Sequence, residues 1–452
     1  MTSFFGDAGT QTQTGVSVAR ILLVYHRAPG SDWLPTYVHS LYSLENYSQH
    51  ECLYLNTARS TLPGYVAAAR PDLVVFHYTF LLLRQVPDEY ARILRLIEFS
   101  KALECPKVLI AQDEQVRVDL LNAFVREFDV SIVFTPAAPS EWRQIYAQVD
   151  QSAVRFKQIL TGYLDESMVA RTVERSRDYR NRSIDVGYRS WYMQPFYGSH
   201  GQLKRQIGQA FKERAPSFGL RVNISNDAKD AFFGDAWFDF LLQCKYTIGV
   251  EGGCSVFDWD GSVARCTADY LASRGQASYE EVEAACFPGL DGKFRYFLMS
   301  PRHLEAVATR TCQVLIEGDY GGVLEAGKHY ISLKRDLSNL DEILTTMKED
   351  KLRAEIVERA YHDVVLSGVY SFRAFAEMVL TESLGMSSTR ARSVSLHRRS
   401  ILATVNRVDE RLWKVLASIT NSIRVVMRRA AGVLLGEERV RRLLRRVRRQ
   451  RG

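Results

Sequence analysis

The stretch Arg20-Ile21-Leu22-Leu23-Val24-Tyr25, followed by His26-Arg27-Ala28-Pro29-Gly30, begins the pattern that decides the fold. A short apolar run that ends in a polar, turn-forming loop is typical of a strand buried in a parallel sheet. From Ser17 onward, similar runs alternate with amphipathic segments of helix length, which is the βαβ rhythm of a sheet covered by helices on both faces. The sequence therefore predicts an α/β fold that begins with a Rossmann-like domain.

Six apolar runs predict the strands of this first domain. Ligands of open parallel sheets bind outside the carboxyl ends of the strands. We therefore expect the loops His26 to Gly30, His77-Tyr78 and Gln112 to Glu114 to share one edge of the sheet. The predicted strands are Arg20 to Tyr25, Glu51 to Leu55, Asp72 to Phe76, Lys107 to Ala111, Ser131 to Phe134 and Phe156 to Leu160.

A second βα series follows the charged stretch Glu166 to Ser183, which lacks strand character and is predicted to link two domains. The expected organisation is a disordered leader (1–16), a first Rossmann-like domain for the acceptor (17–168), a linker (169–183), a second Rossmann-like domain with closing helices (184–386) and a basic tail (387–452). The second-domain strands are predicted at Ile184 to Gly187, Arg221 to Ser225, Tyr246 to Val250, Cys312 to Ile316 and His329 to Leu333, with helices at Gln202 to Glu213, Pro301 to Ala308, Asn339 to Lys351, Leu352 to Val365 and Ser371 to Leu384.

The composition suits a two-domain protein without a membrane span. The chain has 452 residues, of which 46% are apolar, so it can bury two cores. The most apolar candidate for a span, Asp72 to Leu83, is too short and contains His77. The first 15 residues resemble no secretion signal, which predicts a cytoplasmic protein. The seven cysteines are scattered and are expected to be reduced and mostly buried.

The segment from Ile316 to Ile331 is the most informative for function. It reads Ile-Glu-Gly-Asp-Tyr-Gly-Gly-Val-Leu-Glu-Ala-Gly-Lys-His-Tyr-Ile and places Glu317 at the end of a predicted strand, with Glu325 eight positions later. Carboxylates there can accept hydrogen bonds from sugar hydroxyls, and the amides of Gly321 and Gly322 can approach an anion. The alternative is a solvated pair of loop glutamates.

This segment resembles the E-x7-E signature in the C-terminal domain of GT-B glycosyltransferases. The resemblance implies two Rossmann-like domains that face a cleft, with Glu325 holding the donor ribose and Glu317 lying near the transferred sugar. The stretch Lys328 to Asn339 is also similar to a segment of uncharacterised bacterial glycosyltransferase-like proteins and, more distantly, of protein O-glucosyltransferase-like proteins. The loop lacks the usual Phe-Gly and small-residue run of the signature.

Two further clusters are candidates for binding the donor diphosphate. Gly252-Gly253 follows a predicted buried strand and is expected to precede a helix, with Ser255 close by. Arg189 ends the first strand of the second domain, and Lys204 follows it; fixed cations are needed where a leaving diphosphate gathers charge. The alternatives are a plain tight turn for the glycines and a structural ion pair for Arg189.

On the acceptor side, Asp113, Glu114 and His77 follow two strands of the first domain. If the reaction inverts the anomeric centre, one of them deprotonates the acceptor hydroxyl; if it retains configuration, they orient the acceptor. Alternatively, the two acids favour a helix N-terminus and His77 is a satisfied core histidine. We expect no metal and no cofactor, although Asp258-Trp259-Asp260 has the letters of a D-x-D motif.

The tail is the most basic part of the chain. Residues 387–452 hold 18 Lys and Arg against four Asp and Glu, while residues 1–386 hold 41 against 48. Apolar residues recur at three- and four-residue intervals among the arginines, which predicts basic amphipathic helices on an anionic membrane surface. Binding to nucleic acid is less favoured, and packing on the body or on another subunit is the remaining alternative. The residues predicted to contact the membrane are Trp413, Arg424, Arg428, Arg429, Arg441, Arg442, Arg445 and Arg446.

These observations predict a metal-independent glycosyltransferase of the hexosyltransferase type, peripheral on the inner face of the cell membrane. It would move a sugar from a nucleotide sugar to a glycan, a lipid-linked or a protein acceptor, as in polysaccharide biosynthesis. Two alternatives remain open: a non-catalytic GT-B-like protein that binds nucleotide sugars or acts as a scaffold, and a nucleotide-sugar epimerase.

Overall fold

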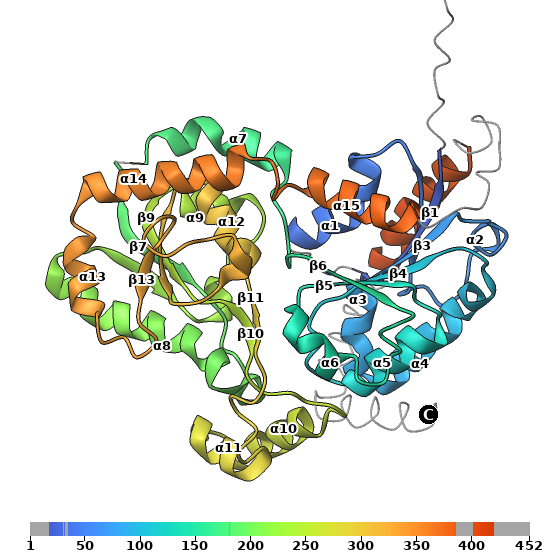
Figure 1. Ribbon diagram of the computed structural model, residues 1–452, viewed down its shortest axis with the longest axis horizontal. Helices are drawn as coiled ribbons and strands as arrows, with labels where there is room; N and C mark the ends of the chain where they lie inside the picture. The colour runs from blue at the N-terminus through green and yellow to red at the C-terminus, as the bar shows by residue number, and fades with distance from the viewer. Residues whose placement is uncertain (1–17, 30, 32–34, 180, 386–400, 420–452) are drawn as a thin grey trace, which may run out of the picture.

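Two parallel sheets, each covered by helices on both faces, form the two lobes of the protein (Figure 1). The computed structural model describes residues 18–29, 31, 35–179, 181–385 and 401–419. The predicted leader lies outside them. The strands of the first sheet, in the order β2-β1-β3-β4-β5-β6, are β1 (Arg20–Tyr25), β2 (Glu51–Asn56), β3 (Leu73–His77), β4 (Lys107–Ile110), β5 (Ile132–Thr135) and β6 (Arg155–Gln158).

Alternation along β1 explains why both faces of this sheet are buried. Leu22 and Val24 point into one apolar cluster, and Ile21 and Leu23 point into a second cluster on the opposite face. Helices α3 to α6 supply the first cluster, and α1 supplies the second. The helices are α1 (Pro35–Asn46), α2 (Gly64–Ala67), α3 (Tyr78–Leu81), α4 (Pro87–Ile97), α5 (Val118–Glu127) and α6 (Trp142–Ile145).

The second sheet has five parallel strands in the order β13-β12-β9-β7-β8. Helices α8 and α13 pack on one face, and α9 and α12 pack on the other. The strands are β7 (Ile184–Arg189), β8 (Val222–Ser225), β9 (Cys244–Gly249), β12 (Cys312–Ile316) and β13 (Ile331–Leu333). The helices are α7 (Glu166–Arg177), α8 (Gly198–Arg214), α9 (Asp235–Leu241), α12 (Pro301–Ala308), α13 (Leu340–Thr346) and α14 (Asp350–Ala360), which continues as a π-helix over Tyr361–Leu366.

The prediction of two Rossmann-like domains is confirmed, and each predicted strand has an observed counterpart within two residues or fewer at either end. Two segments differ from the predicted domain organisation. The predicted linker is mostly helix α7, and the last closing helix, α15 (Phe372–Leu384), packs its apolar face on the first sheet. The reason is burial, because Phe372, Phe375 and Val379 complete the cluster that α1 leaves open.

An insertion between β9 and β12 was not predicted. It contains the antiparallel hairpin β10 (Gly252–Cys254) and β11 (Tyr296–Leu298), with helices α10 (Ser262–Arg274) and α11 (Tyr279–Cys286) between the two strands. Cys266 and Cys286 form a disulfide, so the expectation that all cysteines are reduced is wrong for these two. Helix α10 packs on α11, which brings the Cα atoms of Cys266 and Cys286 to 5.5 Å. A disulfide can bridge this separation.

Residues 401–419 form one helix that packs against the first domain near β1 and β2, which confirms a helix in the first part of the tail. The predicted membrane contacts Arg424, Arg428, Arg429, Arg441, Arg442, Arg445 and Arg446 lie outside the described residues. Among the described residues, no helix is both long enough and apolar enough to cross a bilayer.

Candidate active site

A cavity of about 240 Å³ lies at the point where the strand order of the second sheet reverses, between β7 and β9. Such a switch point opens a crevice because the connections from the two strands leave toward opposite faces of the sheet. The cavity is lined at this edge by Tyr188 to Trp191 and by Thr247 to Val250, and further by Met193, Lys204, Trp237, Ser300, Arg302, His303 and Gln313.

Two cations in this cavity have no carboxylate partner within the described part of the chain. Neither Lys204 of α8 nor Arg302 of α12 makes a salt bridge with any described residue. Burial, followed by the positive charge of Arg302, lowers the pKa of Lys204 to about 8. The Arg302 guanidinium lies 5.1 Å from the centre of the Trp237 ring and donates a hydrogen bond to the carbonyl of Arg189. The pair is therefore placed to bind an anionic group.

Arg189, which the sequence analysis proposed as a ligand of the diphosphate, lines the same cavity, but its guanidinium is bound to other protein groups. Its guanidinium donates to the carbonyls of Asp230, Tyr188 and Asn223 and to the Asn223 side chain, at 2.7–3.0 Å. It also packs over the rings of Phe232 and Phe240. These contacts hold the ends of β7 and β8 together, and they join Arg189 to carbonyl and amide oxygens where the alternative expected an ion pair.

A second cavity, of about 150 Å³, continues from the first into the space between the domains. Trp237, Ser300 and Arg302 line both cavities, while Tyr37 and Gln112 contribute from the first domain. Glu305 lies in its wall and accepts a hydrogen bond from the Trp237 indole at 2.7 Å. Burial raises the pKa of Glu305. Its carboxylate is thus an acceptor positioned in the cleft beside a cation.

Asp113 of the first domain follows Gln112, which lines the second cavity, and does not itself line either cavity. It follows β4 in a left-handed backbone conformation (φ 53°), and its carbonyl accepts a hydrogen bond from the buried Arg84. Among the described residues, none donates a hydrogen bond to its carboxylate. Burial raises the pKa of Asp113, and the nearby charges of Arg84 and Lys204 lower it by a smaller amount. The carboxylate of one domain therefore lies within electrostatic reach of the free ammonium of the other.

Glu114 and His77 were grouped with Asp113 in the sequence, but the structure gives them different roles. Glu114 is completely buried and accepts hydrogen bonds from the hydroxyls of Thr135, Tyr146 and Tyr296. Since Tyr296 belongs to β11, this carboxylate ties the insertion to the first domain. His77 is also completely buried, with its ring nitrogens 3.2 Å from Ser40 Oγ and 3.1 Å from Thr79 Oγ1. Neither side chain can reach an acceptor in this conformation.

Gly252 and Gly253 follow strand β9, as expected, but they lie in strand β10, and the next helix, α10, begins only at Ser262. Gly253 has φ 93°, and a Cβ there would lie 1.7 Å from the carbonyl oxygen of Tyr296. Close approach of the two hairpin strands is the physical reason for this glycine. Ser255 donates to Asp291 at 2.5 Å and accepts from the backbone of His200, which fixes the start of α8.

The D-x-D letters of the insertion have a structural explanation. Asp258 accepts hydrogen bonds from the amides of Val263 and Ala264, and Asp260 accepts from the amide of Ser262. Both carboxylates therefore satisfy free N–H groups in the first turn of α10. Within the described residues, no group of three or more His, Cys, Asp and Glu side chains could hold a metal ion.

The E-x7-E glutamates lie on the surface and line neither of these cavities, while Asp319 and Gly321 between them line a third cavity, described below. Glu325 is 64% exposed in its side chain and pairs with Lys328 at 3.4 Å, and Glu317 is exposed next to the amide of Arg335. Gly321 and Gly322 have φ of 62° and 69° in a short 3-10 turn. The loop is held from below by Glu251, which accepts from the amide of Tyr320 at 2.8 Å. In this conformation, the two glycines supply the positive φ values of the turn.

A third, apolar cavity of about 280 Å³ adjoins the second at Thr161, which lines both. Its wall combines residues that follow β6, residues of β11 and one side of α15. The wall combines aromatic and sulphur-containing side chains with the polar residues Gln158, Thr161 and Asp319; the former are Tyr163, Phe297, Met299, Tyr370, Phe375 and Met378. The cleft therefore has a cationic end in the second domain and an apolar end where the domains meet.

Sequence reasoning missed Arg302, Glu305 and Trp237. A usable signal existed for the first two, because they lie in the first turns of a correctly predicted helix, Pro301–Ala308. Helices that return from a parallel sheet begin at the edge where its strands end, so polar residues in their first turn face the crevice. No local signal marks Trp237, which reaches the cleft only because α9 packs beside α12.

Comparisons with known proteins add little beyond the fold. No protein-family model matches the sequence, and no curated protein does. Among solved structures, HepE of Anabaena in complex with UDP and glucose is similar at 12% identity, with a TM-score of 0.40, over 81% of this chain and 99% of that chain. An alpha-glucosyltransferase in complex with UDP and DNA is similar at 9% identity, with a TM-score of 0.49, over 81% of this chain and 100% of the other.

The T4 phage BGT in complex with UDP-glucose gives 10% identity and a TM-score of 0.46 over 81% of this chain and 100% of that chain. The topology of the chain itself shows its fold class. Two doubly wound sheets face each other across a cleft lined by both, and the chain crosses back to the first lobe at its end (Figure 1). This is the GT-B arrangement that the resemblance implied.

Proposed function

We propose that the protein is a glycosyltransferase that moves a sugar from a nucleotide-diphosphate sugar to an acceptor held by the first domain. One observation carries the proposal. Lys204 and Arg302 of the second domain line one cavity and have no carboxylate partner among the described residues, and the Asp113 carboxylate of the first domain lies within electrostatic reach of Lys204. Transfer of a sugar needs positive charge on the side of the leaving diphosphate and a proton acceptor on the opposite side.

In an inverting reaction, the acceptor oxygen bonds to the anomeric carbon while the bond from that carbon to the diphosphate breaks. The proton of the acceptor hydroxyl passes to Asp113, whose burial raises its pKa and so strengthens it as a base. Lys204 and Arg302 stabilise the charge on the departing diphosphate without a metal ion. In a retaining reaction, Asp113 orients the acceptor instead.

Recognition of the donor hydroxyls is assigned to Glu305. Its carboxylate accepts one hydrogen bond, from Trp237, and has further lone pairs available toward the cleft. The role that the resemblance gave to Glu325 is thus proposed for Glu305, because Glu325 lies on the surface beside Lys328.

The acceptor proposed is a glycan, a lipid-linked molecule or a protein. The apolar third cavity supports an acceptor that carries an alkyl or aryl group close to the reacting hydroxyl. The basic C-terminal region supports a peripheral location at the cytosolic face of a membrane.

A thermal-shift screen tests the donor site. UDP, GDP, ADP, CMP and the corresponding sugars are added to the wild type, to Arg302→Ala and to Glu325→Ala. We expect one nucleotide to raise the melting temperature of the wild type and of Glu325→Ala, and to leave Arg302→Ala unchanged. No shift with any nucleotide would contradict the proposal.

Product analysis then separates the activities. A modified acceptor together with free nucleotide identifies a transferase. A new nucleotide sugar formed without acceptor identifies an epimerase, and binding without turnover identifies a non-catalytic protein.

A further inference from the structure

The helix of residues 401–419 is fixed to the first domain through the open edge of its sheet. Strand β2 is an edge strand, so its outer N–H and C=O groups have no neighbouring strand. The Asn406 side chain accepts from the amide of Tyr54 at 2.9 Å and donates to the carbonyl of the same residue at 3.0 Å. This amide therefore takes the place of a missing strand.

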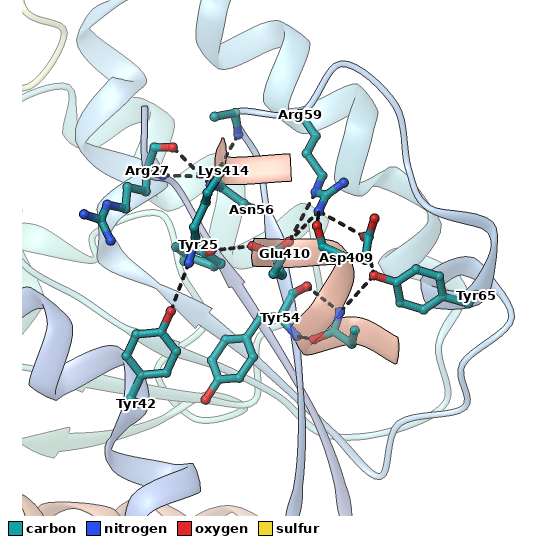
Figure 2. Close-up of polar contacts among 12 residues, drawn as sticks. Tyr25, Arg27, Tyr42, Tyr54, Asn56, Arg59, Tyr65, Asp409, Glu410 and Lys414 are labelled. Carbon is teal, nitrogen blue, oxygen red and sulfur yellow. Dashed lines mark hydrogen bonds and ion pairs between the residues drawn. The ribbon is translucent and has the colours of Figure 1, made fainter. Parts of the chain in front are cut away.

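A network of charged and hydroxyl groups adds to this attachment (Figure 2). Arg59 lies 3.0 Å from Asp409 and 3.1 Å from Glu410. Tyr25, the last residue of β1, donates to Glu410 at 2.7 Å, and Tyr65 donates to Asp409 at 2.6 Å. Both acidic residues of the helix thus point into the domain and are neutralised there.

Trp413 also faces the domain, contrary to the expectation that it inserts into a membrane. The Arg59 guanidinium lies 5.0 Å from the centre of its ring, a cation–π contact. The next residue, Lys414, donates to the hydroxyl of Tyr42 at 3.2 Å. The inner face of the helix is therefore occupied along its length.

The outer face of the same helix carries a continuous apolar stripe. Six aliphatic residues recur at alternating intervals of four and three positions, which places them on one side of a helix. Their exposed fractions are high for residues of this kind: Ile401 56%, Val405 46%, Val408 50%, Leu412 58%, Val415 57% and Ile419 52%.

The charges beside this stripe are positive. Arg411 is exposed next to it, and so is Arg407, which also pairs with Glu45 at 2.7 Å, while Asp409 and Glu410 face inward. The sequence that follows, residues 420–452, holds 11 Lys and Arg against two Asp and Glu. A second copy of the chain would bring these positive charges together, whereas an anionic surface attracts them.

We propose that the outer face of helix 401–419 binds the anionic headgroup region of a lipid bilayer, with the aliphatic stripe inserted and the arginines on phosphates. The inner face of the helix is bound to the first domain at β1 and β2. Binding of the outer face to a bilayer therefore places the first domain, which is the domain assigned to the acceptor, at the membrane surface. The acceptor is then a molecule embedded in the membrane, with its hydroxyl presented at the surface. This last step rests on the proposed function.

Vesicle binding of the full-length protein tests the surface. Wild type, the double variant Val408→Glu/Leu412→Glu and the matched double variant Val86→Glu/Leu290→Glu are mixed with phosphatidylcholine vesicles, with and without phosphatidylglycerol. Val86 and Leu290 are exposed aliphatic residues outside the helix, 50% and 39% exposed. We expect the first double variant to bind anionic vesicles about tenfold or more weakly than the wild type, and the matched variant to bind equally well.

Three results would overturn the proposal. They are unchanged binding of Val408→Glu/Leu412→Glu, equal binding to vesicles without phosphatidylglycerol, and a dimer in analytical ultracentrifugation that this variant abolishes, which would assign the stripe to a second copy. Circular dichroism confirms that the variants fold. The nucleotide thermal shift is recorded for the same samples, so failure of the lipid proposal and failure of the transferase proposal are distinguishable.

Discussion

The switch points of the two sheets have the same topology and different contents. In the second sheet, an open cavity lined by Lys204 and Arg302 lies at the ends of β7 and β9. In the first sheet, β1 and β3 part around His26 and His77, and burial lowers the pKa of these histidines to about 4 and about 3. Strand order therefore locates a possible crevice, but the side chains that fill or leave open that crevice decide whether chemistry can take place there.

A second contrast lies within the first domain, between neighbouring acids. Asp113 has a left-handed backbone conformation and a carboxylate that accepts no hydrogen bond from a described residue, whereas Glu114 accepts from three hydroxyls. The reversal of the chain at Asp113 points the two side chains in different directions. One is free for a ligand, and the other joins the domain to the insertion.

Replacement of the free carboxylate is expected to have the largest effect. Asp113→Asn should lower kcat by about 10²- to 10⁴-fold in an inverting reaction, because the proton of the acceptor loses its base. Nucleotide affinity should stay the same within about twofold, since Asp113 lies on the acceptor side. Asp129→Asn is the control, because Asp129 shares the φ of 53° and is exposed. Equal kcat for the two variants would remove Asp113 from the mechanism.

The open switch point is tested through its fixed cation. Arg302→Ala should weaken binding of the nucleotide diphosphate by about 10- to 100-fold, the usual loss for a charge-assisted contact. Isothermal titration calorimetry gives the Kd. Arg205→Ala, an exposed arginine next to Lys204 on α8, should bind as the wild type does. A normal Kd for Arg302→Ala would show that the diphosphate does not lie in this cavity.

Two glutamates separate the sequence-based assignment from the structural one. Glu305→Gln should weaken donor binding by about tenfold, because it exchanges a charged acceptor for a neutral amide beside the donor hydroxyls. Glu325→Gln should leave the Kd unchanged, since this side chain is 64% exposed and pairs with Lys328. Calorimetry measures the Kd of both variants. Weaker binding by Glu325→Gln together with an unchanged Kd for Glu305→Gln would support the role that the resemblance gave to Glu325.

The smallest expected effect is a pH dependence of donor binding. The pKa of Lys204 is lowered to about 8, so the charged form that attracts a diphosphate is complete below this pH and is lost above it. Affinity should therefore fall several-fold between about pH 7 and about pH 9.5. Lys204→Arg should bind with no such fall over this range, because a guanidinium stays charged. A parallel decline in both proteins would assign the titration to another group.

Much of the fold was readable from the sequence because its signals are local. Runs such as Arg20 to Tyr25 and Cys312 to Ile316 are apolar except for Arg20 and Gln313, which suits strands buried on both faces, and both were predicted at their observed bounds. The hairpin β10–β11 was missed because Gly252 and Gly253 are poor strand formers, and their pairing with Leu298 and Phe297 crosses more than forty residues.

The candidate site was less readable. The sequence placed Asp113 and Lys204 at the correct edges, because polar residues that follow buried strands or open the next helix face the crevice. It could not separate Asp113 from Glu114 or Arg189 from Arg302, since the distinction depends on which hydrogen-bond partners other segments supply.

By itself, the sequence determined the two doubly wound domains and the basic, amphipathic character of the tail, since apolar periodicity and charge are properties of neighbouring residues. Only the tertiary structure decided that α15 completes the first domain, that Trp413 packs inward under Arg59, and that the outer stripe of helix 401–419 stays exposed. The physical reason is that burial and hydrogen bonding between segments far apart in the chain decide which of two similar side chains is left free to act.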